Sequence, residues 1–326
     1  HQRLDATFDP TRGRIAEAYG STLRIWSADG RLLASRDTGL AGVTAVDLDP
    51  KGEHLAQGDR QGRVLVRSSL VGDVEAVFAL HEGPVVALDW SPVASALAVA
   101  GPDHLLRTWR VLEGGPNAVG FGHQDGLTDV AFDASGQQLA SASRDGSVRL
   151  WSPDLQELNN IEAHSQGVNR VAWSGDGRLA SWPIQAPLPA TGPSPNLPRT
   201  FFAGGEANLE LQVEHGDGFG AWAPGSAKLA SATFDDMALI DGYSGRRRPD
   251  QHGAARLHDL QFSHDGTALA GGTEGGSVYV MDGRTGALKL ALRGHAGRVN
   301  ALAFSRDDSL LVSGSEDGTV RVWKRD

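Results

Sequence analysis

A histidine, a serine and an aspartate occur together twice in this chain with the same spacing. His123, Ser141 and Asp145 form the first set, and the second set begins at His295, 172 residues further on. In a hydrolase, such a serine is the nucleophile, the histidine takes its proton and the aspartate orients the histidine. A single set would favour acyl-transfer chemistry. Two sets in similar surroundings favour a structural role that is rebuilt in each copy of a repeated unit.

The surroundings of the two sets match over a longer stretch. Residues 122–151 read GHQDGLTDVAFDASGQQLASASRDGSVRLW, residues 294–323 read GHAGRVNALAFSRDDSLLVSGSEDGTVRVW, and 12 of their 30 positions are identical. Weaker copies lie at 6–26, 43–67, 85–109, 168–182, 218–241 and 257–282. The chain is therefore built from internal repeats.

The repeat has a nearly constant period. The units end at Trp26, Arg67, Trp109, Trp151, Asp241, Asp282 and Trp323, with successive spacings of 41, 42, 42, 90, 41 and 41 residues. The spacing of 90 holds two units and a few extra residues. A period near 41 is typical of units of four short strands, and eight such units account for all 326 residues.

Each unit has the pattern of antiparallel strands. Apolar residues alternate in LTDVAF (127–132) and VNALAF (299–304), which puts one face of each strand inward. A strand of small residues follows, then an Asp-Gly turn and a strand that ends in Trp. One four-stranded sheet cannot cover both of its own faces, so the pattern predicts sheets that pack face to face around an axis.

Gly122-His123 with Trp151, and Gly294-His295 with Trp323, resemble the WD40 repeat family. The resemblance spans essentially the whole chain, although Ser152 and Lys324 replace the aspartate that follows the tryptophan in the family. It implies an all-β fold: one eight-bladed β-propeller over residues 1–326, made of four-stranded antiparallel blades. A seven-bladed ring is the alternative and would leave one clear unit unused.

The resemblance also implies what the recurrent polar residues do. One hydrogen-bonded set is His123, Ser141, Asp145 and Trp151, and the other is His295, Ser313, Asp317 and Trp323. A buried indole N–H needs an acceptor, and a buried aspartate needs donors. Other units keep parts of the set: His81, Asp103 and Trp109 with Val99 at the serine position; His164 and Ser181; Ser231 and Asp235; His252; His1 and Trp26. We therefore expect blades 4 and 8 to be the most rigid.

The fifth unit is interrupted by a proline-rich insertion. Residues 183–199 hold six prolines in 17 positions, which predicts a loop because proline cannot donate to a strand ladder. We expect TFFAGG (200–205) and LELQV (209–213) to be strands three and four of blade 5, with strands two and three as the alternative. The insertion is either a tolerated surface loop or an arm that contacts a partner.

Ring closure is the least determined feature. The chain ends three residues after Trp323, so no residues remain for an outer strand of blade 8. We expect either an upstream segment to supply that strand or a blade of three strands.

Composition restricts the function classes. The net charge of −10 argues against nucleic acid, and the basic run Arg246-Arg247-Arg248 is more typical of a solvated turn. The chain has no cysteine, no apolar run long enough to insert in a membrane, and no P-loop, GxSxG or HExxH motif. Most of the eleven histidines fall at the repeating loop position, so we expect no metal, cofactor or catalytic residue.

The lack of a visible signal peptide favours the cytoplasm, while the lack of an initial Met keeps export as the alternative. High Ala, Gly and Arg with few Lys suggests a bacterial source.

These observations favour a non-catalytic scaffold or recognition module that binds proteins or peptides on the top rim of the ring. The expected contact residues are Arg60, Arg144, Phe234, Glu274 and Glu316 before the second turn, Thr128, Asn169, His258 and Asn300 at the first strand, and Trp182 at the insertion. Phe234 and Trp182 are included as large apolar anchors, and packing between blades is the alternative for Phe234. The alternative function is a propeller enzyme, or a protein that binds a small ligand or metal in the central channel.

Overall fold

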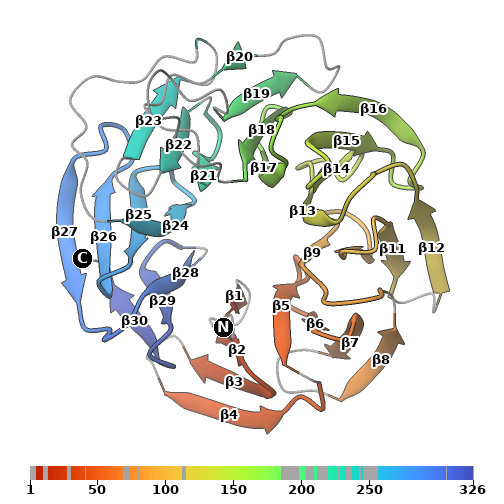
Figure 1. The fold of residues 1–326 in the computed structure, drawn as a ribbon. Helices are drawn as coiled ribbons and strands as arrows, with labels where there is room; N and C mark the ends of the chain where they lie inside the picture. Colours follow the sequence, from red (N-terminus) through yellow and green to blue (C-terminus); the bar gives the residue numbers. More distant parts are fainter. Residues whose placement is uncertain are drawn as a thin grey trace.

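The repeats fold into antiparallel sheets that stand around a ring (Figure 1). The structure is a computed structural model and describes residues 5–9, 14–27, 31–40, 42–68, 73–79, 81–111, 115–184, 198–202, 209–210, 219–226, 228–232, 237–241, 244, 256–305 and 307–325. Within these ranges the chain forms eight sheets, numbered here in chain order, and all the strand pairs are antiparallel.

The first four sheets have four strands each. Sheet 1 holds β1 (Asp5–Asp9), β2 (Arg14–Tyr19), β3 (Thr22–Ser27) and β4 (Leu32–Asp37). Sheet 2 holds β5 (Val43–Leu48), β6 (His54–Asp59), β7 (Arg63–Ser68) and β8 (Val74–Ala79). Sheet 3 holds β9 (Ala87–Trp90), β10 (Ala96–Ala100), β11 (Leu106–Arg110) and β12 (Gly115–Gly120). Sheet 4 holds β13 (Leu127–Phe132), β14 (Leu139–Ser143), β15 (Ser147–Trp151) and β16 (Glu157–Glu162).

Among the described residues, the last four sheets have either three or four strands each. Sheet 5 holds β17 (Val168–Trp173), β18 (Arg178–Pro183), β19 (Arg199–Phe202) and β20 (Leu209–Glu210). Sheet 6 holds β21 (Phe219–Trp222), β22 (Lys228–Ala232) and β23 (Met237–Asp241). Sheet 7 holds β24 (Leu257–Phe262), β25 (Ala268–Thr273), β26 (Ser277–Asp282) and β27 (Leu288–Arg293). Sheet 8 holds β28 (Val299–Phe304), β29 (Leu310–Ser315) and β30 (Val320–Lys324).

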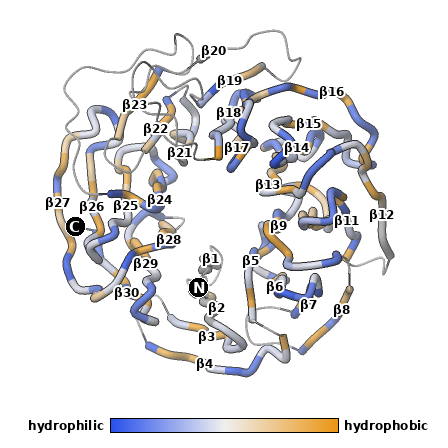
Figure 2. Tube along the Cα trace, viewed as in Figure 1, coloured by the Kyte–Doolittle hydropathy of each residue, from blue (hydrophilic) through white to orange (hydrophobic). Residues whose placement is uncertain are grey.

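The innermost strands form a closed circle of contacts. Along the chain, β1, β5, β9, β13, β17, β21, β24 and β28 each touch the next, and β28 touches β1 (Figure 1). All of these strands begin at the same end of the ring, which we call the top rim. Hydrophobic and hydrophilic residues are interspersed along the strands (Figure 2), as expected for strands that pack on neighbours through alternate side chains.

Small residues on the second strands let the sheets approach closely. All five residues of LASAS in β14 are buried, and Ala140 and Ala142 pack with Val168 and Val171 of the next sheet. A Cβ atom placed on Gly58 of β6 would lie 2.5 Å from Cγ1 of Val85, so only glycine fits at that contact. The core therefore lies between sheets rather than within any single one.

Aspartates on the inner strands tie successive sheets together. Oδ2 of Asp47 accepts the backbone N–H of Trp90 at 2.9 Å, and Oδ2 of Asp89 accepts that of Phe132 at 2.5 Å. The same bonds join Asp129 to Val171 at 3.0 Å and Asp259 to Leu302 at 2.8 Å. Burial, and then the nearby charge of Asp47, raise the pKa of Asp89 well above its ordinary value. These carboxylates satisfy backbone donors that the inner edge of each sheet would otherwise leave open.

The interrupted unit keeps its four strands. β19 pairs with β18 and β20 pairs with β19, so strands three and four of sheet 5 lie where the sequence places them. Most of the proline-rich insertion, residues 185–197, lies outside the described residues. In sheet 8 the described residues supply three strands. Across the described ranges, the fold has no helix with the length and hydrophobicity that a membrane crossing needs.

Candidate functional site

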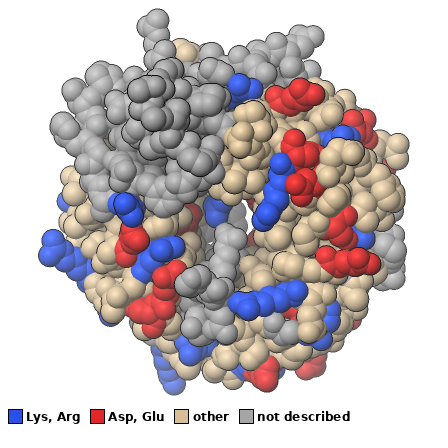
Figure 3. Space-filling view, viewed as in Figure 1, with Lys and Arg blue, Asp and Glu red and all other residues tan. Residues whose placement is uncertain are grey.

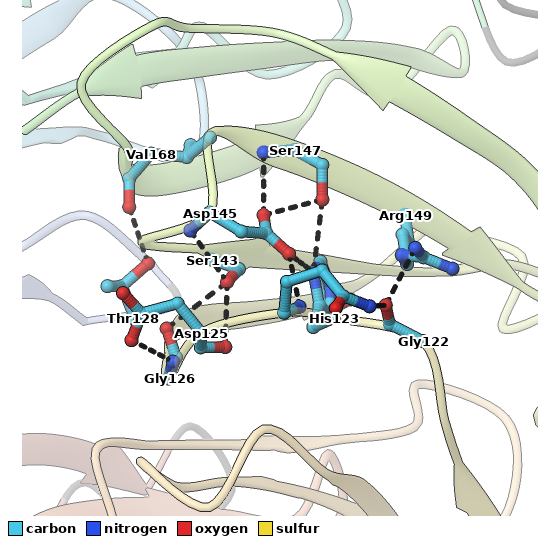
Figure 4. A network of polar contacts seen from close by, with 12 residues as sticks. Gly122, His123, Asp125, Gly126, Thr128, Ser143, Asp145, Ser147, Arg149 and Val168 are labelled. Carbon is cyan, nitrogen blue, oxygen red and sulfur yellow. Dashed lines mark hydrogen bonds and ion pairs between the residues drawn. The ribbon is translucent and has the colours of Figure 1, made fainter.

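The His–Ser–Asp–Trp set of sheet 4 is assembled as one network, and Figure 4 shows the part of it around His123, Asp145 and Ser147. Nδ1 of His123 lies 3.0 Å from Oδ2 of Asp145, and its Nε2 lies 2.7 Å from Oγ of Ser141. The indole Nε1 of Trp151 donates to the same Ser141 oxygen at 2.8 Å. Ser147 adds a hydroxyl that donates to Oδ1 of Asp145 at 2.7 Å. The network joins the loop before β13 to β14, to the turn after β14 and to β15.

Sheet 8 repeats this arrangement. Nδ1 of His295 lies 3.2 Å from Oδ2 of Asp317, and its Nε2 lies 2.8 Å from Oγ of Ser313. Trp323 donates to Ser313 at 2.8 Å. Thr319 takes the place of Ser147, with its hydroxyl donating to Oδ1 of Asp317 at 2.6 Å.

The electrostatics of both sets suit a fixed structural network. Burial lowers the pKa of His123 and of His295, so both imidazoles are held neutral. Burial alone would raise the pKa of Asp145, but hydrogen bonds from Ser147 and from the backbone N–H of Gln124 outweigh it and lower the pKa to about 2. Ser141 is fully buried and its oxygen already bonds two partners, so no substrate can reach it. The arrangement holds loops in place and does not perform acyl transfer.

Sheet 3 shows what the serine contributes. Nδ1 of His81 lies 2.6 Å from Oδ1 of Asp103, as in the complete sets. Val99 stands at the serine position, and both Nε2 of His81 and Nε1 of Trp109 are buried without a side-chain partner. Two polar atoms that share an acceptor in sheet 4 therefore have none here.

Replacing Val99 by threonine is expected to raise the free energy of unfolding by about 1 kcal/mol, because a hydroxyl restores the shared partner while one methyl group remains. Urea denaturation of the purified protein measures the change. Val99→Ala is the control: it removes apolar volume without adding a hydroxyl and should destabilise. A threonine variant less stable than the wild type would show that the two nitrogens gain nothing from an acceptor at this position.

Several expected contact residues come together in one pocket of about 570 Å³ at the top rim. It lies where β5, β9, β13 and β17 begin and where the turns after β6 and β14 pass. Its lining is Thr44, Arg60, Pro84, Val85, Val86, Leu127, Thr128, Arg144 and Asn169. We call it the rim pocket. Four of the contact residues expected from the sequence line it: Arg60, Thr128, Arg144 and Asn169.

The walls of the rim pocket are fixed by bonds between sheets. The Thr44 hydroxyl donates to the carbonyl of Val85 at 2.7 Å, and the Thr128 hydroxyl donates to that of Val168 at 2.6 Å (Figure 4). The side chain of Arg60 lies over Gly42, where a Cβ atom would be 3.4 Å from Nε of that arginine. Gly42 also has a φ of +90°, so a side chain there would be strained. The pocket is therefore shaped before any partner arrives.

Three other expected contacts form a separate charged cluster over sheets 7 and 8. The carboxylate of Glu274 lies 3.4 Å from Arg256 and 3.8 Å from Arg298, and Arg298 lies 3.8 Å from Glu316. His258 lies among these charges, and burial lowers its pKa. The charges of this cluster thus largely neutralise one another. Figure 3 shows basic and acidic side chains intermixed around the centre of the drawn face.

The three remaining residues that we expected to contact a partner are found in different situations. Asn300 is half-buried on β28 and is not among the residues that line the rim pocket. Phe234 lies outside the described residues. Trp182 was wrongly assigned to the rim: its side chain is fully buried. It packs against sheet 6, and its indole N–H donates to Oγ of Ser231 at 3.2 Å, because its position on β18 faces the neighbouring sheet.

Three tryptophans at the ends of inner strands also bond to neighbouring sheets, and they were not predicted from the sequence. Trp90 donates to the carbonyl of Asp47 at 3.3 Å, and Trp173 donates to that of Ala131 at 3.0 Å. Trp222 donates to the carbonyl of Ala172, also at 3.0 Å. Each indole thus reaches the preceding sheet. The available signal was a large aromatic residue at the last position of the first strand, which is also Phe132, Phe262 or Phe304 in other units.

Among the described residues one acid–histidine group has the spacing of a metal site: Asp49, Glu53 and His54, whose ligand atoms lie within 4.8 Å of one another. The oxygens of Asp49 are already used. Oδ1 accepts the backbone N–H groups of Glu53 at 2.6 Å and His54 at 3.0 Å, and Oδ2 lies 3.2 Å from Nδ1 of His54. These bonds explain the group as the closure of the turn between β5 and β6.

Comparison with known proteins agrees with this geometry. Residues 115–152, 155–181 and 286–324 match the family model described as WD domain, G-beta repeat. The crystal structure of the computationally designed Ika8 protein superposes with a TM-score of 0.83, covering 100% of this chain and 97% of that one at 22% identity. That likeness shows the fold alone.

Curated relatives match over part of the chain. Periodic tryptophan protein 2 of Arabidopsis thaliana is 32% identical over 104 residues, covering 32% of this chain and 12% of that protein. Angio-associated migratory cell protein of Homo sapiens is 28% identical over 171 residues, covering 47% and 39%. SIR4-interacting protein SIF2 of Saccharomyces cerevisiae is 24% identical over 175 residues, covering 49% and 32%. The chain thus spans less than half the length of these relatives.

These relatives are eukaryotic proteins and give no support to a bacterial source. With the two polar networks, these matches identify residues 115–152, 155–181 and 286–324 of the chain as WD40 repeats.

Proposed function

We propose that this protein is a non-catalytic recognition module, an eight-bladed WD40 propeller in one domain, and that it binds a protein or peptide partner at the rim pocket. WD40 proteins are generally non-catalytic and typically act as scaffolds for protein interactions. The closed circle of contacts through eight inner strands supports the blade number. One relative is named for a protein interaction, the SIR4-interacting protein SIF2.

The observation that carries this proposal is the pocket itself. Residues from four consecutive sheets converge there. Exposed Arg60, Arg144 and Asn169 surround half-buried Val86 and exposed Pro84, which combines polar donors with apolar surface. An extended segment of a partner finds both kinds of contact in one place. We place the protein in the cytoplasm, with export as the alternative.

Selection of peptides from an unbiased display library on the purified protein tests the proposal. Selected peptides should bind at the rim pocket, so Asn169→Trp, which fills the pocket from an exposed position, is expected to weaken binding at least tenfold. The control is Lys51→Trp, an exposed substitution in the turn after β5 at the opposite end of the ring. Failure to select any binder, or equal binding to the wild type and Asn169→Trp, would contradict the proposal.

The alternative taken from the sequence, an enzyme or a ligand-binding protein that uses the central channel, has no observation in the described residues that favours it. The polar sets that resemble a hydrolase triad are buried and already bonded.

A further inference from the structure

We propose that the rim pocket recognises an acidic side chain of an extended protein segment, either a carboxylate or a phosphorylated residue, followed by an apolar residue. This inference rests on the proposed function and names the chemistry of its ligand. It is carried by an imbalance of charge: two arginines and no acidic residue are among the nine lining residues, although the whole chain has 40 acidic and 30 basic residues.

Arg144 is the central residue of the argument. Its side chain is exposed at the mouth of the pocket, and in the described part of the chain it takes part in no ion pair. Other arginines on the same rim have carboxylate partners: Arg63 lies 2.7 Å from Asp59, and Arg107 lies 2.8 Å from Asp103. An arginine fork that faces a pocket without such a partner is suited to a carboxylate or phosphate from outside.

The amide of Asn169 is a second side-chain donor in the pocket. The hydroxyl protons of Thr44 and Thr128 are used in bonds to the next sheet. The exposed guanidinium of Arg144 and the exposed amide of Asn169 are side-chain donors on the same lining. These two donors, with no carboxylate among the nine lining residues, favour a ligand that brings several acceptor oxygens.

The apolar residues of the lining favour a ligand that also carries an apolar residue. Pro84 is exposed and Val86 is half-buried, next to buried Val85 and Leu127. A pocket of about 570 Å³ has room for more than one side chain. An apolar residue beside the acid therefore covers this surface and excludes water from the charged contact, which strengthens it.

The charged cluster over sheets 7 and 8 favours a protein segment over a nucleic acid. Glu274 and Glu316 lie on the same rim, and the net charge of the chain is −10. A long polyanion that reaches beyond the rim pocket would meet these carboxylates, whereas a single acidic side chain in a mixed segment would not.

The test uses the peptides selected on the full-length protein, resynthesised with one position varied as Glu, phosphoserine or Gln. We expect the Glu and phosphoserine forms to bind at least tenfold more tightly than the Gln form, and the two acidic forms to show which source of negative charge fits better. Arg144→Glu is expected to weaken binding of the acidic peptides at least tenfold, whereas Lys51→Glu, the same charge change at the opposite end of the ring, leaves it within twofold. A peptide with Lys in place of Glu should regain affinity for Arg144→Glu.

The outcomes separate this inference from the proposed function. If selected peptides are neutral or basic, lose binding with Asn169→Trp and are indifferent to Arg144→Glu, the pocket is a recognition site but the acidic ligand is wrong. If neither variant changes binding, both proposals fail. Arg144-dependent binding of a single-stranded oligonucleotide that is tighter than that of any acidic peptide would overturn the choice of a protein ligand.

Discussion

Protonation of the unfolded chain at His164 is expected to lower the free energy of unfolding by about 3 kcal/mol between pH 7 and pH 4, and His164→Gln should abolish this contribution. His164 is buried, with Nε2 at 2.8 Å from Oγ of Ser181. Its Nδ1 is buried without a hydrogen-bond partner, because its unit lacks the aspartate of the complete sets. Burial, and then the charge of Arg199, lower the pKa of His164 to about 3.

The sign of the pH effect on stability follows from the pKa of His164 in the folded and in the unfolded chain. The folded protein keeps His164 neutral down to about pH 3, whereas the unfolded chain takes up a proton below the ordinary value of 6.5. Stability is therefore fully present above pH 6.5 and is lost as the pH falls toward 3. His81, His123 and His295 also have pKa values lowered by burial and add to the loss in the wild type.

Urea denaturation at pH 7 and at pH 4 measures this prediction. Glutamine is neutral at both values and keeps a polar group near Ser181, so the variant should lose less stability between them. His104→Asn is the matched control, because it removes an exposed histidine and leaves the buried ones in place. An equal loss in the wild type and in His164→Gln would show that His164 is not protonated on unfolding in this range.

Ser141→Val is expected to lower the free energy of unfolding by about 3 kcal/mol, since it leaves two buried nitrogens without their shared partner. The Ser141 oxygen accepts from Trp151 at 2.8 Å and lies 2.7 Å from Nε2 of His123. Trp151 is 1% exposed, so water cannot replace the lost acceptor. Thermal or urea unfolding of the purified variant gives the change directly.

The equivalent substitution in sheet 8, Ser313→Val, allows the effect of burial on the loss of stability to be compared. Ser313→Val breaks the equivalent bonds, but Trp323 is only partly buried, and water reaches its surroundings more readily. Its loss of stability should therefore be smaller than that of Ser141→Val. Equal stability of Ser141→Val and the wild type, or a larger loss at Ser313, would contradict the role assigned to burial.

The sequence predicts much of this fold because the unit is local and repeated. The strand pattern, the turn and the polar set all lie within about 41 residues, so two well-preserved copies reveal them. The proline-rich interruption also kept its strand order, since TFF and LE retain the spacing of strands three and four. Features that depend on how one sheet meets the next were harder to derive.

Trp182 illustrates that difficulty. A tryptophan next to an insertion suggests an exposed anchor, but the direction in which its side chain points depends on the packing of sheet 6.

The residues of the rim pocket could be predicted from the sequence more successfully than the pocket itself. The individual residues Arg60, Thr128, Arg144 and Asn169 could be named from their positions in each unit. Their convergence in one pocket, apart from Glu274 and Glu316, follows from ring geometry that no single unit contains.

The aspartate ties on the inner strands have a consequence for molecular recognition. Asp47, Asp89 and Asp129 join β5, β9, β13 and β17 in an uninterrupted series. The rim pocket is built on these same four strands, so its floor belongs to a stiff arc of the ring. A ligand that enters there has little conformational entropy to remove from its host, and modest contacts can then produce useful affinity.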